Sequence, residues 1–295
     1  MTHALPLPDF EHERVEVVTG PRSGLLIIGA LHSSTLGPAL GGARLWTYPT
    51  WVDALGDALR LSAAMTLKNA AAGLDAGGGK AVLRLSPGEV LTAERRHDAF
   101  LDLGDVVASL GGLYRTAEDV GSTTEDMLVV SERTPHVVGL PSSVGGSGEP
   151  ALPTSVGVYS SLRATLEAVT GSADVAGRRF TISGLGQVGG RLARRLGDEG
   201  ASLTVTDVVD ARRALADELG ATWAEPGSEH LAEADVFVPA GIGGVLTDEV
   251  IDALAASAVC GPANNPLAER AGAARLAARG VLYAPDFIVN AGGVI

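Results

Sequence analysis

The chain has 295 residues, of which 46% are hydrophobic, and a formal net charge of −13 at pH 7, and this length suffices for one or two domains with complete cores. The acidic balance argues against nucleic acid and anionic membranes as partners, because both attract basic surfaces. Cys260 is the only cysteine, which excludes an intrachain disulfide, and the lack of a basic, apolar leader or a long uncharged apolar run predicts a cytoplasmic protein without a membrane span.

The first half of the chain alternates short apolar runs with longer amphipathic segments. Residues 25–30 and 80–85 have the length and apolarity of buried strands. Residues 51–68 predict a helix, because apolar side chains recur on one face and Thr50 stands where an N-cap belongs. Residues 93–110 predict a second amphipathic helix with a charged outer face.

A run rich in Pro, Ser and Gly at 141–153 predicts a hinge or linker. After it, Thr154 is placed to cap a helix with apolar residues at four-residue spacing. Residues 179–183, 187–199 and 203–206 then have the patterns of a strand, a helix and a strand, which together make a βαβ unit. Similar alternation continues to the end of the chain, which predicts an α/β protein.

The turn after the strand at 179–183 has the sequence GLGQVG, a GxGxxG motif that opens a helix. In such a turn the first glycine permits a tight bend, the second admits a pyrophosphate to the backbone, and the third allows close packing of helix on strand. Free N–H groups at the helix start face the phosphates. The sequence therefore predicts a dinucleotide site formed by Gly184, Gly186, Gln187, Val188 and Gly189.

Asp207 ends the next predicted strand, about 20 residues beyond the motif, where an acid can accept hydrogen bonds from the adenosine ribose hydroxyls. Its carboxylate would repel a 2′-phosphate, so NAD is predicted in preference to NADP. The alternative interpretation is that Asp207 only caps the following helix. Arg212 and Arg213 leave some room for NADP, although we interpret them as solvated helix charges.

Two lysines flank a nearly uncharged stretch of small residues, MTLKNAAAGLDAGGGK, which ends on Lys80. Desolvation beside three glycines would lower the pKa of Lys80 and make it a usable base. Asp119 follows a strand-like run at 113–115, where an acid can exchange protons with a substrate nitrogen. Local sequence alone supports equally well an aspartate that caps a helix starting near Thr123.

With these motifs the chain resembles the glutamate, leucine, phenylalanine and valine dehydrogenase family, most closely its leucine and valine members. The matching stretches follow the family order along nearly the whole chain, and they are GPALGGARLWTY at 37–48, MTLKNAAAGLDAGGGK at 65–80, TAEDVGSTTED at 116–126, TSVGVY at 154–159, GLGQVG at 184–189, GPANN at 261–265 and LYAPDFIVNAGGVI at 282–295.

The resemblance implies an N-terminal α/β substrate-binding and catalytic domain at residues 1–140. It implies a C-terminal Rossmann domain that binds NAD at residues 154–295, with the hinge at 141–153 and a cleft between the domains. The implied reaction is the reversible oxidative deamination of an L-amino acid to its 2-oxo acid and ammonia. It needs no metal, and the expected assembly is a homo-oligomer.

The resemblance also implies roles for individual side chains. Lys68 would hold the substrate α-carboxylate, and Lys80 would activate water during hydrolysis of the imine. Asp119 would move protons to and from the amino group. The remaining residues at the carboxylate and at the nicotinamide would be Asn290, Thr154 and Asn264.

The side-chain pocket of the family corresponds here to an apolar set without a lysine or serine that could meet a γ-carboxylate. This argues against glutamate and for a branched or small aliphatic substrate. One methylene changes discrimination by only about 1–3 kcal/mol, so leucine, isoleucine and valine are not separated. The alternatives are a phenylalanine-type enzyme, or a catalytically impaired NAD-binding homologue, because relatives continue beyond the position of Ile295. The pocket residues are Leu40, Gly41, Ala117, Ala291 and Val294.

Overall fold

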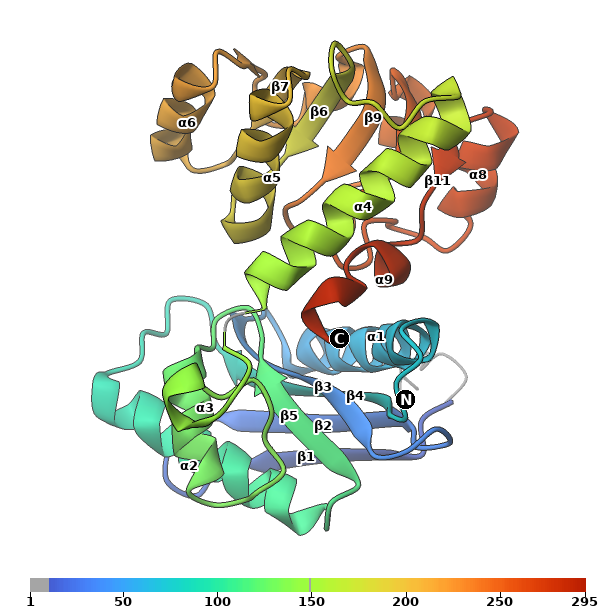
Figure 1. Ribbon diagram of the computed structural model, residues 1–295. Helices are drawn as coiled ribbons and strands as arrows, with labels where there is room; N and C mark the ends of the chain where they lie inside the picture. Colours follow the sequence, from blue (N-terminus) through green and yellow to red (C-terminus); the bar gives the residue numbers. More distant parts are fainter. Residues whose placement is uncertain (1–10, 149) are drawn as a thin grey trace, which may run out of the picture. The chain divides into compact units, whose positions relative to one another are not determined.

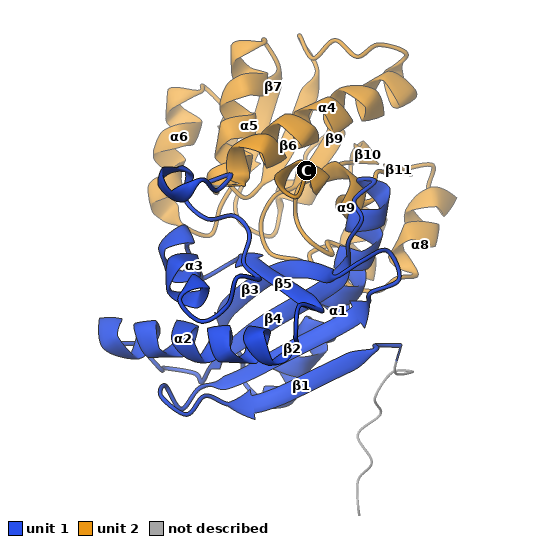
Figure 2. Cartoon of the chain, turned by 60° about the horizontal axis from the view of Figure 1, so that its bottom comes forward, with its two compact units in different colours: residues 1–149 blue, residues 150–295 orange. Residues whose placement is uncertain are grey.

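The computed structural model describes residues 11–148 and 150–295. The chain divides into two compact units, Met1–Glu149 and Pro150–Ile295 (Figure 2). Each unit has its own sheet and its own hydrophobic clusters. The prediction of an α/β chain with two domains is therefore confirmed.

The first unit is built on a five-stranded sheet (Figure 1). Its strands, in spatial order, are β1 (Arg14–Thr19), β2 (Leu26–Ser33), β4 (Gly77–Leu85), β3 (Ala39–Thr47) and β5 (Tyr114–Glu118). β2 runs antiparallel to both β1 and β4, whereas β3 runs parallel to both β4 and β5. The carboxyl ends of β3 and β5 therefore lie at the same edge of the sheet, as does that of β4.

Helices cover both faces of this sheet (Figure 1). They are α1 (Trp51–Ala71) on one face, and α2 (Ala93–Ser109) with α3 (Thr124–Ser131) on the other. The alternation of side chains along β4 separates the two cores, because Val82 packs against α1 whereas Leu83 packs with Phe100 of α2. α1 begins where the sequence predicts, with Thr50 and Asp53 in a reciprocal capping box.

Two glycines of β4 let neighbouring elements approach its backbone. A Cβ on Gly78 would lie 2.2 Å from the backbone nitrogen of Thr66, so this glycine admits α1. A Cβ on Gly79 would lie 2.7 Å from the ring of Tyr114, which fills the opposite face. The glycine run before Lys80 therefore allows close backbone packing, and it brings α1 directly onto the strand that carries Lys80.

The second unit contains a six-stranded, all-parallel sheet (Figure 1). In spatial order the strands are β8 (Thr222–Trp223), β7 (Ser202–Thr206), β6 (Arg179–Ser183), β9 (Ala234–Pro239), β10 (Ala256–Val259) and β11 (Leu282–Tyr283). The first strand in sequence, β6, is central, and the order runs outward from it in both directions. This is the strand order of a Rossmann fold, whose ligands bind outside the carboxyl ends of the strands where the order reverses.

Two layers of helices enclose this sheet. Val236 and Val238 belong to the core shared with α4 (Ala151–Thr170) and α5 (Gln187–Asp198), whereas Phe237 packs with α7 (Asp248–Ala253) and α8 (Gly272–Ala278). The smaller helices of the unit are α6 (Arg213–Glu218) and α9 (Asp286–Val289). Among the described helices, none combines the length and the apolarity that a membrane span requires.

The start of α4 corrects one prediction. Within the predicted linker, a 3-10 helix forms at Ser142–Val144, Glu149 lies outside the described residues, and α4 begins at Ala151. Thr154 is therefore inside the first turn rather than at the N-cap, and its Oγ1 donates a hydrogen bond to the backbone oxygen of Pro150 at 2.7 Å. Proline is tolerated in a first helical turn because the N–H groups there have no partner within the helix, and this extends the helix backwards.

Candidate active site

The registers of β3, β4 and β5 place the predicted residues of the first unit on one face of the sheet. Leu40 pairs with Gly78, and Gly42 pairs with Ala117. Residues two apart on a strand share a face, so Lys80 joins this set two positions after Gly78. It is the face that α1 covers. Gly41 lies between two of these positions, and its oxygen accepts a hydrogen bond from Tyr114 at 2.7 Å.

Lys80 and Asp119 form a direct ion pair on this face. The Nζ atom of Lys80 lies 2.7 Å from Oδ2 of Asp119. The Lys80 side chain is 5% exposed and that of Asp119 is 16% exposed, so the pair is largely desolvated. The two residues to which the resemblance assigns catalytic roles are therefore in contact.

A further cation, Arg44, holds the same oxygen of Asp119. Its Nε atom donates to Oδ2 of Asp119 at 2.9 Å, and its Nη1 donates to Oδ2 of Asp57 at 2.8 Å. The hydroxyl of Tyr48 donates to the same oxygen of Asp57 at 2.7 Å. Sequence reasoning missed all three of these residues. No alternation of apolar side chains marks Arg44, because two glycines precede it in β3.

Burial and charge move the pKa values of the pair in definite directions. Burial lowers the pKa of Lys80, and the positive charge of Arg44 lowers it further, against the opposing effect of Asp119. Burial alone would raise the pKa of Asp119, but Lys80 and Arg44 outweigh it and lower this pKa to about 2. Asp119 is thus ionised at any working pH, while Lys80 releases its proton more readily than an exposed lysine.

The turn that carries Asp119 decides between the two interpretations of this residue. The N-cap of α3 is Thr123, which forms a capping box with Asp126, so Asp119 is not the helix cap. The backbone nitrogen of Asp119 donates to Oγ of Ser122 at 2.8 Å, and Ser122 donates in turn to the backbone oxygen of Ala43 at 2.7 Å. The carboxylate is left to face Lys80 and Arg44.

The distribution of lysine marks the same region independently. Lysine occurs only at positions 68 and 80, and all the other residues among the 22 basic ones are arginine. Lys68 is 8% exposed near the end of α1, and Lys80 is 4% exposed in β4. Next to Lys68, the amide of Asn69 donates to the backbone oxygen of Gly77 at 2.5 Å, which ties α1 to β4. Both lysines of the chain are therefore buried in the first unit, and lysine, unlike arginine, can lose its proton when it is buried.

In the second unit, the predicted nucleotide turn joins β6 to α5 at the point where the strand order reverses. Gly184 has φ +110°, and a Cβ on it would lie 2.7 Å from the nitrogen of Gly241. A Cβ on Gly189 would lie 2.1 Å from the oxygen of Gly184. These two glycines are therefore required by the turn itself and by its packing against the helix.

Gly186 differs from these two glycines. The nearest described atom to a Cβ on Gly186 would be Nη1 of Arg212 at 3.8 Å, so the protein itself leaves room there. α5 starts at Gln187 with Gly186 as its N-cap and has no side-chain cap. Its first N–H groups, including that of Val188, are thus left for a ligand, and the turn fits a dinucleotide pyrophosphate.

Asp207 follows β7 and is built into this turn. Its Oδ2 accepts a hydrogen bond from the nitrogen of Leu185 at 2.7 Å, and its Oδ1 accepts one from Val209 at 2.9 Å. The next helical segment, Asp210–Arg212, has Val209 as its N-cap without a side-chain bond, so Asp207 is not a helix cap. The prediction that Arg212 is only solvated is wrong, because its guanidinium donates to the oxygen of Leu185 and lies 3.7 Å from Asp207.

The C-terminal segment gathers the remaining predicted residues of the second unit. The amide nitrogen of Asn290 donates to Oδ1 of Asn264 at 3.0 Å and to the oxygen of Pro262 at 3.1 Å. A Cβ on Gly293 would lie 2.4 Å from Oγ1 of Thr154, so the segment also packs on α4. Ala291 is buried and Val294 is partly buried within the same segment.

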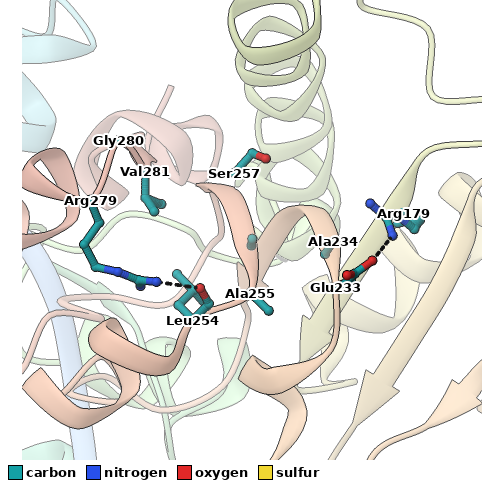
Figure 3. Close-up of a pocket in the computed structure, with 10 residues that line it drawn as sticks. Arg179, Glu233, Ala234, Leu254, Ala255, Ser257, Arg279, Gly280 and Val281 are labelled. Atoms are coloured by element: carbon teal, nitrogen blue, oxygen red, sulfur yellow. Dashed lines mark hydrogen bonds and ion pairs between the residues drawn. The ribbon is translucent and has the colours of Figure 1, made fainter.

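A separate pocket lies at the other end of this sheet (Figure 3). Its lining includes Arg179, Ala234 and Ala256, the first residues of β6, β9 and β10. These are the amino ends of the strands, opposite the nucleotide turn. In the described parts of the chain, no cluster of three His, Cys, Asp or Glu side chains has the arrangement of a metal site.

Parts of both units match models of one protein family. Residues 12–136 match the Glu/Leu/Phe/Val dehydrogenase dimerisation domain, and residues 221–295 match the Glutamate/Leucine/Phenylalanine/Valine dehydrogenase domain. Leucine dehydrogenase of Thermoactinomyces intermedius is 41% identical over 97% of this chain and 77% of its own length. Phenylalanine dehydrogenase of Caldalkalibacillus thermarum is 43% identical over 97% of this chain and 78% of its own length.

Solved structures agree with these matches. The L-tryptophan dehydrogenase of Nostoc punctiforme has a TM-score of 0.73 and 36% identity, over 96% of this chain and 80% of that one. A hetero-hexameric glutamate dehydrogenase of Thermus thermophilus has a TM-score of 0.80 and 24% identity, over 96% of this chain and 74% of that one, a likeness of fold. The chain thus belongs to the Glu/Leu/Phe/Val dehydrogenase family, whose members are amino-acid dehydrogenases that depend on a nicotinamide dinucleotide.

Proposed function

We propose that this protein catalyses the reversible, NAD-dependent oxidative deamination of a branched or small aliphatic L-amino acid to its 2-oxo acid and ammonia. The observation that carries the proposal is the buried contact of 2.7 Å between Lys80 and Asp119. A lysine with a lowered pKa beside an ionised carboxylate can both activate water and move protons.

Each side chain of the first unit has one task in this proposal. Lys68 binds the substrate α-carboxylate by charge. Asp119, which is ionised, accepts a hydrogen bond from the amino group and passes its proton on. Lys80 in its neutral form removes a proton from the water that attacks the imine carbon, and this proton passes through Asp119 to the nitrogen of the resulting carbinolamine. Lys80 then takes the hydroxyl proton as the carbon–nitrogen bond breaks and releases ammonia.

The second unit is proposed to bind the cofactor. Bound NAD would accept the hydride that leaves the substrate Cα. The turn Gly184–Gly189 holds the pyrophosphate, and Asp207 accepts from the adenosine ribose. Thr154 and Asn264 are proposed to line the nicotinamide, with Asn290 supporting carboxylate binding through its hydrogen bond to Asn264.

Replacement of Asp207 by asparagine tests the choice of cofactor. The neutral amide no longer repels a 2′-phosphate and loses a charged acceptor, so we expect the ratio of kcat/KM for NAD to that for NADP to fall by about 10- to 100-fold. Steady-state kinetics with both cofactors measure this ratio. Asp210→Asn makes the same charge change three residues away at an exposed position and should leave the ratio unchanged. An unaltered ratio in Asp207→Asn would refute this role of Asp207.

The proposed substrate class is tested by following NADH formation with separate L-amino acids at alkaline pH. The apolar positions Leu40, Ala117, Ala291 and Val294 favour valine, leucine or isoleucine over glutamate, and one of the three should give the highest kcat/KM. If none of the three gives NADH, the aliphatic assignment is wrong.

A phenylalanine-type enzyme is the second candidate, because phenylalanine dehydrogenases are among the relatives. Phenylalanine dehydrogenases match this chain at 41–43% identity, as closely as the leucine dehydrogenases do. A higher kcat/KM for phenylalanine than for all three aliphatic substrates would establish this candidate.

We also propose that the protein assembles as a homo-oligomer, because residues 12–136 match a dimerisation domain.

A further inference from the structure

The Lys80–Asp119 pair is part of a longer line of charges that links β3, β4, α1 and the turn after β5. Lys80 comes from β4, Arg44 from β3, and Asp57 from α1, while Asp119 follows β5. Arg44 stands in the middle, with one nitrogen on each acid. Its side chain is 14% exposed and that of Asp57 is 12% exposed, so water replaces these contacts poorly.

The geometry fixes which oxygen of Asp119 remains for other partners. Nζ of Lys80 and Nε of Arg44 both hold Oδ2, at 2.7 and 2.9 Å. Two cations on one oxygen fix the rotation of the carboxylate about its Cβ–Cγ bond and direct Oδ1 away from them. Lys80 alone could not do this, because its flexible stem lets the pair rotate together.

Arg44 in turn has its orientation fixed by Asp57. Oδ2 of Asp57 accepts from Nη1 of Arg44 at 2.8 Å and from the hydroxyl of Tyr48 at 2.7 Å, while Oδ1 accepts from Arg60 at 2.5 Å. Arg60 is the exposed end of the line, at 47%. A planar guanidinium held at both Nε and Nη1 cannot turn, and this rigidity is what a positioning group needs.

We propose that Arg44, anchored by Asp57, is a positioning residue that fixes the Asp119 carboxylate and supplies a permanent positive charge beside Lys80. The proposal rests on the proposed function, in which neutral Lys80 is the base. Arg44 does not touch substrate or cofactor in this role and acts only through Asp119 and Lys80.

The charged groups around Lys80 determine the direction in which its pKa should move when Arg44 is lost. They are Asp119 after β5, Arg44 in β3 and Asp57 on α1, whereas Tyr48 and Arg60 contact Asp57. Arg44 lies within about 6 Å of Lys80, since both hold one oxygen, and a like charge at this range disfavours the ammonium. Loss of Arg44 should therefore make Lys80 hold its proton to higher pH. Loss of the Asp57 charge should have the opposite effect.

The experiment titrates Lys80 without turnover. Wild-type protein that carries ¹³C at the lysine Cε gives signals from two lysines only, and loss of one signal in Lys68→Arg assigns them. Arg44→Lys adds a third signal, which is identified by its absence from the wild type. We expect the midpoint of Lys80 to rise by one pH unit or more in Arg44→Gln, to be partly restored in Arg44→Lys, and to fall in Asp57→Asn. The rising limb of kcat/KM against pH should move in the same directions.

A matched control separates these shifts from general loss of stability. Arg22 pairs with the buried Asp102 at 2.8 Å in the same unit, and Arg22→Gln should leave the Lys80 midpoint unchanged. A Lys80 midpoint that stays in place in Arg44→Gln, or that moves in the same direction in Asp57→Asn, overturns the proposal. Should Arg44→Gln fail to fold, Asp57→Asn and Arg44→Lys still give the direction in which the Lys80 midpoint shifts. An inactive wild-type protein whose Lys80 midpoint shifts as expected would instead refute the proposed function alone.

Discussion

Replacement of Lys80 by methionine should lower kcat for amino-acid oxidation by about 10²- to 10⁴-fold, the range that a positioned general base contributes. Methionine fills the buried space of the lysine stem in β4 but has no proton acceptor. Arg44, the other described side chain that donates to Oδ2 of Asp119, cannot replace this base, because arginine does not give up its proton. Steady-state kinetics over a pH series provide the measurement.

Lys80→Arg is the matched variant for this prediction. It keeps the positive charge beside Asp119, but arginine does not give up its proton, so it should be nearly as inactive as Lys80→Met. Lys68→Arg should behave differently, because a guanidinium still binds a carboxylate, and its effect should fall mainly on KM. Activity in Lys80→Arg within tenfold of the wild type would mean that Lys80 contributes charge rather than base catalysis.

Replacement of Asp119 by asparagine should lower kcat by a comparable factor of about 10²- to 10⁴-fold, for a different reason. The amide keeps the shape of the side chain but cannot carry a proton between substrate and solvent. It also leaves Lys80 buried beside Arg44 without a counter-ion, which lowers the pKa of Lys80 further. The rising limb of kcat/KM against pH should therefore move to lower pH while the maximum falls.

Asp126→Asn provides the comparison for Asp119→Asn. Asp126 is also a largely buried aspartate paired with an arginine, Arg96, at 2.5 Å in the same unit, but it completes the capping box of Thr123 at the start of α3. This variant should lose about 1 kcal/mol of unfolding free energy and keep the position of the pH limb. If Asp119→Asn loses only stability as well, the carboxylate has no part in proton transfer.

Local pattern was sufficient for the elements whose side chains repeat regularly. The strand at 179–183 has the bounds of β6, and Thr50 caps α1 as expected. The pattern failed where glycine and charge interrupt it, because β3 contains Gly41, Gly42 and Arg44 and so lacks the apolar alternation of a strand. Residues held by close packing rather than by propensity are not visible to such rules.

The residues of the candidate site likewise fall into those that local sequence predicts and those that depend on contacts between distant segments. The turn Gly184–Gly189 was predictable because its roles are local, namely a tight bend, a helix start and close packing. The choice between a catalytic and a capping role for Asp119 was not, because its partners Lys80 and Arg44 are 39 and 75 positions away in sequence. Only the registers of β3, β4 and β5 bring them together.

The restriction of lysine to two buried positions also determines how this protein responds to a protease that cuts only after lysine. Complete digestion by such a protease gives the pieces 1–68, 69–80 and 81–295. Both cutting points lie within regular elements, α1 and β4, on the face that carries the candidate site. A chain must leave its helix or strand before a protease can bind it, so the rate of cleavage measures the opening of this region alone. The second unit contains no lysine, so the same digestion does not report its unfolding.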